Sequence, residues 1–317
     1  MQCSTWTVLR RKRPFIKRHL LVVDRYRDLR RLMFGHLEFF EFVLFAFDKH
    51  TNLAVDLDTY MIRIIKCPDE MNEIRYNLKL AYKTSALGHT YIINECVPMY
   101  GFLNEWYIQN YLEIYQLRQE TYVWEAPHVI VFDLDSTLIT DELDVRIRDE
   151  NVYCSLYELK EKGCVLVLWS YGNEEHVSHS LKKTNLTDFF DIVICKGYKT
   201  ISDNDNDDDT QTNVSTGRVV VDKKNDTVYV DKQFYLDIED GDRLPKSPRI
   251  VLWHLRKIGV NYIKSLTLVD DLRSNNYSYD FFVNVKKCPQ PRQDWYLYHD
   301  LILENLQTHD RDFESAQ

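Results

Sequence analysis

Short continuous apolar runs alternate with amphipathic stretches through the C-terminal part of the chain. The runs Val129–Phe132, Val165–Trp169 and Leu266–Val269 are rich in β-branched and apolar residues and too short to form the core of a helix. Such runs are typical of strands that are buried on both faces of a sheet. Between them, segments such as Glu174–Lys183 carry apolar side chains at helical spacing. The alternation predicts an α/β domain over residues 126–317, with a Rossmann-like parallel sheet that has helices on both faces.

Residues 1–125 show a different pattern, in which apolar residues recur at helical spacing. The spacing is clearest in Leu20–Phe47 and in Trp106–Leu117, where aromatic side chains dominate the apolar face. The sequence therefore predicts a mostly helical N-terminal region. Most of these aromatic side chains are expected to fill a core, and a minority to anchor contacts with another protein.

An insertion over residues 200–240 interrupts the α/β pattern. It begins with the acidic segment Ser202–Asp209, which has no apolar residue after Ile201 and is expected to be a mobile loop. Two β-branched runs, Arg218–Val221 and Thr227–Val230, flank an Asn-Asp pair and predict a β-hairpin. The insertion therefore adds an acidic loop and a small hairpin to the predicted sheet domain.

Charge is distributed unevenly along the chain. Residues 1–31 contain ten Lys and Arg against two Asp, whereas the remainder is acidic enough to bring the net charge to −9. A basic arm on an acidic body favours an anionic partner, such as nucleic acid or an acidic protein surface. The alternative is a basic helix face that is solvated or forms salt bridges with the acidic body. The run Arg10–Arg13 also fits a nuclear import signal.

Cysteine spacing and hydropathy indicate an intracellular protein. The seven cysteines are odd in number and form no CxxC pair, which favours free thiols in a reducing compartment over a zinc site or a disulfide framework. The most apolar stretch, Phe39–Phe47, has only nine residues and includes Glu41. A stretch of that length is too short to span a bilayer, and no secretory signal is visible. We therefore expect no membrane association.

Two carboxylates follow the first apolar run at a spacing of two. Asp133 and Asp135 come directly after Val129–Phe132, and residues i and i+2 of an extended chain point to the same side. Like charges held close together repel, and a divalent cation that prefers oxygen ligands is the simplest compensation. The segment therefore predicts a hard-metal site. The alternative is a solvated turn, which is the usual setting of two aspartates after a strand.

Further polar residues follow the other predicted strands in order. Ser170 ends the second strand, and the pair Asp270 and Asp271 ends the strand that begins near residue 265. Lys246 stands before a predicted helix that a Ser-Pro pair opens, and a helix start favours anions. The carboxyl ends of parallel strands form the edge where such sheets bind ligands. The alternatives are an ordinary strand-ending serine and a surface lysine.

The four motifs, taken in order, resemble those of the haloacid dehalogenase superfamily, in its phosphatase branch. The run Asp-Leu-Asp-Ser-Thr-Leu resembles the first motif, and Ser170, Lys246 and the paired aspartates resemble the second, third and fourth. The resemblance implies that Asp133 is a nucleophile that forms an aspartyl-phosphate. It also implies that Asp135 protonates the leaving oxygen and later activates a water molecule.

The same resemblance implies a Mg²⁺ cofactor and a set of groups that bind the phosphoryl oxygens. Oxygen atoms of four residues would hold the ion or its waters: Asp133, Asp135 through its backbone carbonyl, Asp270 and Asp271. Ser170 and Lys246 would bind the phosphoryl oxygens, and Thr137 would support the loop by hydrogen bonds. The hairpin insertion stands where superfamily members carry a cap, and so small a cap leaves the site open to a macromolecule.

Over its whole length the chain resembles a family of nucleocapsid-assembly phosphatases from baculoviruses. That resemblance rests on chain size, on the aromatic N-terminal region and on the first and fourth motifs. It implies a phosphoric monoester hydrolase that removes phosphate from Ser or Thr of a basic DNA-packaging phosphoprotein. It also implies contact with viral capsid proteins, in the host nucleus and the virion nucleocapsid. Two alternatives remain open: a small-molecule phosphatase, and a structural nucleocapsid or scaffold protein that keeps the fold.

Overall fold

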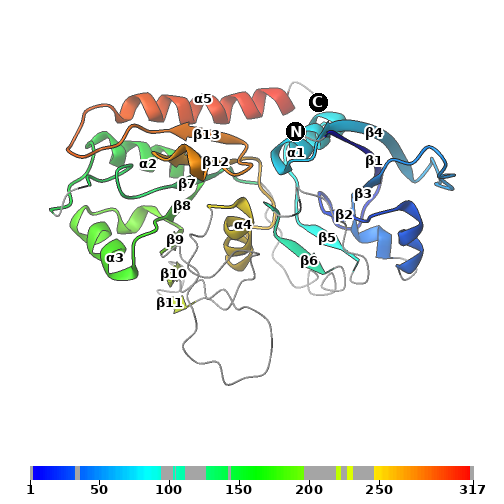
Figure 1. The fold of residues 1–317 in the computed structure, drawn as a ribbon, viewed down its shortest axis with the longest axis horizontal. Coiled ribbons are helices and arrows are strands. Elements are labelled where there is room, and N and C mark those ends of the chain that lie inside the picture. The colour runs from blue at the N-terminus through cyan, green and yellow to red at the C-terminus, as the bar shows by residue number, and fades with distance from the viewer. Residues whose placement is uncertain are drawn as a thin grey trace, which may run out of the picture.

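Figure 1 shows the computed structural model of the protein, in which two large β-sheets lie side by side. The structure describes residues 3–32, 36–93, 103, 105–110, 126–141, 144–195, 219–222, 227–230 and 246–314. One sheet is formed by strands from the N-terminal part of the chain, and the other by strands from residue 129 onward. The protein is therefore a mixed α/β structure with two sheets that are at least partly parallel.

The second sheet follows the predicted alternation of strands and helices. Its five strands are ordered β13-β12-β7-β8-β9, and every neighbouring pair is parallel. The strands are β7 (Val129–Phe132), β8 (Val165–Trp169), β9 (Ile192–Ile194), β12 (Leu266–Asp270) and β13 (Phe281–Asn284). The three central strands are buried almost throughout, which explains why their sequences are continuous apolar runs.

Helices cover both faces of this sheet, as the pattern predicted. They are α2 (Asn151–Glu161), α3 (Glu174–Lys183), α4 (Pro248–Lys257) and α5 (Trp295–Glu314). Helices α2, α3 and α5 pack on the face that carries Ile130 and Phe132, and α4 packs on the opposite face with Val129 and Val131. Alternate residues of one strand therefore fill two cores. Among the described residues, no helix has both the length and the apolar character that crossing a lipid bilayer requires.

The first sheet shows that the prediction of a mostly helical N-terminal region was wrong. Its strands are ordered β4-β1-β3-β2-β5-β6; β1 runs antiparallel to both neighbours, and the other pairs are parallel. The strands are β1 (Cys3–Arg11), β2 (Leu20–Val22), β3 (Phe42–Ala46), β4 (Tyr60–Pro68), β5 (Thr90–Ile92) and β6 (Ile108–Asn110). The helical elements described in this region are α1 (Met71–Tyr82), the 3-10 turns Tyr26–Arg31 and His36–Phe39, and 3-10 residues at positions 103 and 105.

The segment Leu20–Phe47 explains the error. Its buried apolar residues fall mainly into two short runs, which form β2 and β3 and pair with each other and with strands from elsewhere in the chain. Short apolar runs fit a buried strand as well as a helix, so local spacing did not decide between them. Of the second segment predicted as helical, residues 108–110 form β6, and 111–117 lie outside the described residues.

The basic residues near the N-terminus belong to this sheet. Arg10 lies in β1, and its Nε donates a hydrogen bond to Glu41 Oε1 over 2.8 Å. Arg11 Nη1 donates to the hydroxyl of Tyr60 over 3.0 Å. These two arginines are thus paired within the protein, but they lie on a strand and not on the helix face that the alternative interpretation assumed.

The predicted hairpin of the insertion is confirmed. Strands β10 (Val219–Asp222) and β11 (Thr227–Val230) pair in antiparallel register and form a separate two-stranded sheet. Figure 1 places this hairpin next to β9, at one side edge of the parallel sheet. The acidic segment 202–209 lies outside the described residues.

Polar contacts join the two large sheets. Arg75 of α1 donates from Nε to Asp280 Oδ1 over 3.2 Å, and the side chain of Lys79 donates to the backbone oxygen of Lys264. Burial opposes ionisation of Asp280, but Arg75 and Lys79 lower its pKa below the usual value. An N-terminal helix therefore carries cations that the C-terminal part of the chain neutralises.

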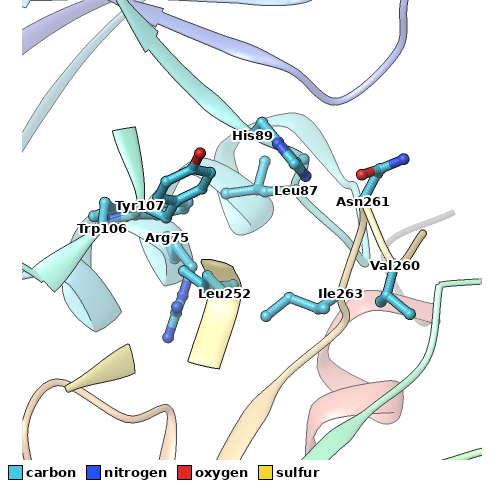
Figure 2. Close-up of a pocket in the computed structure, with 10 residues that line it drawn as sticks. Arg75, Leu87, His89, Trp106, Tyr107, Leu252, Val260, Asn261 and Ile263 are labelled. Atoms are coloured by element: carbon cyan, nitrogen blue, oxygen red, sulfur yellow. The ribbon is translucent and has the colours of Figure 1, made fainter. Parts of the chain in front are cut away.

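The pocket in Figure 2 also lies where the two parts meet. Leu87 and His89 line it from the N-terminal side, and Leu252, Asn261 and Ile263 from the C-terminal side. Leu87 and Ile263 form an isolated antiparallel bridge across it. The cavity volume of about 20 Å³ leaves room for a water molecule and excludes a substrate. The chemistry of the protein must therefore be sought elsewhere.

Candidate active site

Asp133 stands at the carboxyl end of β7, at the start of a tight loop. Its backbone N–H donates to the carbonyl of Val269 in β12, so the sheet fixes its position. The chain then turns back through Ser136, whose φ of 59° lies in the left-handed region. Thr137 Oγ1 donates to Asp133 Oδ2 over 3.1 Å. Thr137 therefore contacts the carboxylate of Asp133 from within the same loop.

A buried arginine, Arg148, donates hydrogen bonds to the backbone of this loop. Arg148 donates from Nη1 to the carbonyls of Ser136 and Thr137 over 3.4 and 3.3 Å. Its Nε and Nη2 donate to the two carboxylate oxygens of Asp294, each over 2.9 Å. The sequence alone did not indicate Arg148, because its carboxylate partner Asp294 lies 146 residues away in the chain.

Lys246 links two of the predicted aspartates. Its Nζ donates to Asp133 Oδ1 over 2.6 Å and to Asp270 Oδ2 over 2.7 Å, and the lysine side chain has no solvent exposure. A buried ammonium group needs carboxylates around it, and buried carboxylates need a cation. Burial raises the pKa of Asp133 to about 6, and the charge of Lys246 opposes that shift. Lys246 is therefore central to the site and not a surface lysine.

Asp270 ends β12 and is fully buried. Its carboxylate also accepts from the backbone N–H of Leu272 over 2.7 Å and from Asn275 Nδ2 over 2.9 and 3.0 Å. Asn284 Nδ2, at the end of β13, donates to the backbone oxygens of Asp270 and of the residue after it, each over 3.1 Å. Sequence reasoning missed both asparagines, because neither belongs to a pattern of charged residues.

Asp271 completes a group of three carboxylates. One oxygen atom from each of Asp133, Asp270 and Asp271 lies within 4.8 Å of the others. Burial, followed by the charge of Asp270, raises the pKa of the Asp271 carboxyl. Such a raised pKa means that a nearby cation would stabilise the ionised group. Oxygen ligands grouped in this way could hold a hard divalent cation such as Mg²⁺.

Asp135 lies at the same edge of the sheet but contacts different residues. Ser170 Oγ, at the end of β8, donates to Asp135 Oδ2 over 3.0 Å. His176 Nε2 lies 2.6 Å from Asp135 Oδ1, and about a third of the Asp135 side chain is exposed. The structure therefore brings the predicted residues together and adds His176. The signal that could have found His176 is a histidine in the first turn of the helix after the second motif.

Comparison with known proteins assigns the chain to a family. The sequence profile of the family described as "Protein of unknown function (DUF705)" matches residues 4–314. The chain belongs to the DUF705 family. The match covers both sheets, so the N-terminal sheet and the site are parts of one family architecture.

Three relatives of this DUF705 chain are viral proteins. The "Uncharacterized 38.0 kDa protein in P143-LEF5 intergenic region" of Autographa californica nuclear polyhedrosis virus is 43% identical over 317 residues, which cover 98% of each chain. The "Uncharacterized 36.0 kDa protein" of Orgyia pseudotsugata multicapsid polyhedrosis virus is 42% identical over 98% of this chain and 97% of its own. A 41.0 kDa protein of Cryptophlebia leucotreta granulosis virus is 40% identical over 98% and 87%. The chain is thus similar to baculovirus proteins along nearly its whole length.

In this DUF705 protein, Glu105 from the part of the chain before the parallel sheet contacts the residue after Lys246. Ser247 caps α4, because its Oγ accepts the N–H of Arg249 over 3.3 Å, and Pro248 occupies the first helical position, as predicted. Ser247 Oγ donates in turn to Glu105 Oε2 over 2.9 Å. Burial raises the pKa of Glu105, and the hydrogen bond from Ser247 opposes that shift. The part of the chain before the parallel sheet therefore helps to position Lys246.

A second group of titratable side chains lies at the opposite edge of the same sheet. His128, His309 and Asp310 offer ligand atoms within 4.8 Å of one another. However, Lys264 Nζ lies 3.2 Å from Asp310 Oδ1, and Lys79 Nζ lies 3.3 Å from His309 Nε2. Two ammonium groups face a single carboxylate here, whereas Lys246 faces three carboxylates at the other edge, so this group would repel a divalent cation. We interpret this group as a structural network that ties α1 and α5 to the sheet.

Proposed function

We propose that the protein is a Mg²⁺-dependent phosphatase of the haloacid dehalogenase superfamily, with that superfamily's Rossmann-like fold and an aspartyl-phosphate intermediate. The observation that carries the proposal is the contact of buried Lys246 with both Asp133 and Asp270, at the carboxyl edge of a parallel sheet. Apolar residues of similar size would stabilise a core as well as a buried ion pair does. A buried lysine between two aspartates therefore favours a catalytic role over a structural one.

Asp133 would act as the nucleophile. One of its carboxylate oxygens forms a bond to phosphorus while the bond from phosphorus to the leaving oxygen breaks, and the electron pair remains on that oxygen. Asp135 gives the leaving oxygen its proton, and the product alcohol departs. Lys246 would offset the charge of the phosphoryl oxygens, and Ser170 would donate a hydrogen bond to one of them. The pKa of Asp133, about 6, leaves this carboxylate ionised near neutral pH.

Water would complete the cycle. The carboxylate of Asp135 takes a proton from a water molecule as the water oxygen attacks phosphorus. The bond between phosphorus and Asp133 breaks, inorganic phosphate leaves, and both aspartates return to their starting states. The same carboxyl group therefore serves once as acid and once as base.

The carboxylate group fits a Mg²⁺ ion. The residues that would hold it are Asp133, Asp270 and Asp271, with the backbone carbonyl of Asp135. All of these donors are oxygen atoms, and burial raises the pKa of both Asp133 and Asp271, so a cation would stabilise their ionised forms. When bound, the ion would neutralise charge on the phosphoryl oxygens.

The substrate we propose is phosphoserine or phosphothreonine of a basic DNA-packaging protein, in the assembly of viral nucleocapsids. The similarity of the whole chain to baculovirus proteins supports this setting, and its net charge of −9 would attract a basic partner. Phosphate cancels positive charge on such a partner, and its removal restores binding to the DNA backbone. This role would place the protein in the host nucleus and the virion nucleocapsid, in contact with capsid proteins.

The test is Mg²⁺-dependent phosphate release from a phosphorylated arginine-rich peptide by the full chain. We expect release by the wild type, none after chelation of Mg²⁺, and none by Asp133→Asn. Asp48→Asn is the matched control, because Asp48 is an exposed aspartate just beyond β3. Turnover by Asp133→Asn would refute the nucleophile. A folded but inactive wild type would favour the scaffold protein, and a strong preference for small phosphate esters would favour the small-molecule phosphatase.

A further inference from the structure

We infer that His176 is a positioning residue for the acid–base group Asp135, an inference that rests on the proposed phosphatase function. His176 Nε2 lies 2.6 Å from Asp135 Oδ1, within hydrogen-bonding distance. The other carboxylate oxygen, Oδ2, accepts from Ser170 Oγ over 3.0 Å. His176 and Ser170 therefore each contact a different oxygen of the Asp135 carboxyl group.

The surroundings of His176 hold its ring in this place. Its backbone N–H donates to Asn173 Oδ1, the cap of α3, over 2.8 Å. A Cβ atom added at Gly172 would come within 2.7 Å of His176 Cδ2 and 3.2 Å of Ser170 Oγ. The imidazole therefore packs directly against the glycine backbone, and no larger residue fits at position 172 without moving it. This packing orients Nε2 toward Asp135.

The same turn orients the hydroxyl of Ser170. Gly172 N–H donates to Ser170 Oγ over 3.0 Å, which leaves the hydroxyl hydrogen free to point at Asp135 Oδ2. In the proposed reaction Ser170 contacts a phosphoryl oxygen, so its hydroxyl turns away from Asp135. Asp135 Oδ2 then becomes available to the leaving oxygen while His176 still holds Oδ1. His176 thus keeps the carboxyl group oriented during the step in which Ser170 releases it.

A purely structural role would predict a different outcome. The side chains of His176 and Asp135 are 40% and 36% exposed, and ion pairs at such exposure contribute little to stability. Loss of the imidazole should therefore leave folding nearly unchanged. Loss of the imidazole should slow phosphate release from substrates whose leaving group needs a proton, and should have little effect on the others.

The experiment compares two substrates with His176→Ala in the full chain. A phosphoserine peptide has a poor leaving group that needs a proton, and p-nitrophenyl phosphate has a good one that needs little help. We expect His176→Ala to lower kcat on the peptide by about tenfold to a hundredfold, with KM unchanged, and on p-nitrophenyl phosphate by less than about threefold. His176→Gln, whose amide can donate a similar hydrogen bond, should recover part of the loss. His179→Ala, one turn further along α3 and exposed, is the matched control and should match the wild type.

The outcomes separate this inference from the proposed function. If the wild type is active and Asp133→Asn is not, an equal loss on both substrates, or no loss, overturns the role of His176 alone. A loss confined to the peptide supports it. If the wild type releases phosphate from neither substrate, the proposed function and this inference both fall.

Discussion

Both sheets place aspartates just beyond the ends of their strands, yet these aspartates lie in opposite environments. Asp48 follows β3 of the N-terminal sheet, is exposed, and accepts from His50 N–H and Thr51 Oγ1 over 2.9 and 3.0 Å. Those bonds lower the pKa of Asp48. Asp133 follows β7 of the parallel sheet and is buried, and burial raises its pKa to about 6.

The contrast lies in where the partners come from. The partners of Asp48 are two and three residues away, whereas Lys246 is 113 residues away from Asp133. A local, solvated arrangement forms whenever the chain turns. A buried carboxylate loses its hydration, so it persists only where the fold supplies a distant cation. A candidate site is therefore distinguished from an ordinary turn by burial and by a cation from a distant part of the chain. Position after a strand does not distinguish the two.

Removal of that cation should give the largest effect. Lys246→Met would leave Asp133 and Asp270 buried without their shared partner, and it would remove positive charge from the phosphoryl site. We expect phosphatase activity to fall by about a hundredfold to a thousandfold, as when one preorganised donor is lost. Phosphate release under saturating peptide measures it. Lys264→Met, which removes a lysine at the opposite edge of the same sheet, should keep the activity.

A double variant guards against misfolding in that experiment. Lys246→Met combined with Asp270→Asn removes one of the two buried charges, so stability should recover while activity stays low. If stability did not recover, the lower activity of Lys246→Met would be assigned to misfolding, and the comparison with Asp48 would lose its meaning.

The contact between the two sheets should give the next largest effect. Arg75→Met would leave Asp280 with less compensation for its burial, at a cost of about 3 to 5 kcal/mol in the free energy of unfolding. Urea unfolding measures the cost, and hydrogen exchange locates it. We expect faster exchange in both sheets. Arg63→Met, which alters an exposed arginine of strand β4, is the control. Faster exchange confined to the N-terminal sheet would show that the sheets unfold independently.

The parallel sheet could be predicted because the residues of each central strand show, by themselves, the pattern of a buried strand. Val129–Phe132 and Val165–Trp169 are buried on both faces, and a continuous apolar run of that length, followed by a polar residue, is typical of such a strand. The N-terminal sheet could not, since Leu20–Val22 and Phe42–Ala46 become strands through pairing with β1 and β5. Such pairing joins residues far apart in the chain, and periodicity within one segment does not register it.

The same distinction applies to the candidate site. Asp133, Ser170 and Asp270 stand at strand ends, so the direction of the strands brings them together. His176 and Asn275 reach the site from a helix and a 3-10 turn, and their roles depend on how these elements pack. Sequence order therefore predicts which groups meet, and packing determines which side chains hold them in place.

The pH dependence of stability should distinguish the two edges of the parallel sheet. Burial lowers the pKa of His128 to about 4 and of His309 to about 3, compared with 6.5 for an unperturbed histidine. At a pH between the folded and the unfolded pKa of each histidine, the unfolded chain binds a proton that the folded chain does not. The free energy of unfolding should therefore fall as the pH falls from about 6.5 toward 4, by about 1 to 2 kcal/mol for each histidine at pH 5.

The control for this prediction removes both histidines. The raised pKa of Asp133 acts in the opposite direction, because the folded state then binds the extra proton. Urea midpoints at about pH 7 and pH 5 should thus be compared between the wild type and the double variant His128→Asn, His309→Gln. The double variant should lose less stability on acidification. An equal loss in both proteins would assign the acid sensitivity to other groups.

The smallest effect is expected at Asn173, the cap of α3. Its contact resembles that of Asp48, since each exposed side chain accepts from a backbone N–H two or three residues later, although Asn173 lies in the parallel-sheet part of the chain. Asn173→Ala should therefore cost about 1 kcal/mol in thermal unfolding, and Asn173→Ser should restore most of it, because serine also caps helices. If local contacts stabilise only their own turn, the lost stability is that of the first turn of α3 alone. A cost well above about 2 kcal/mol would mean that the cap acts through His176 on the buried site, and local and distant partners would then not be separable.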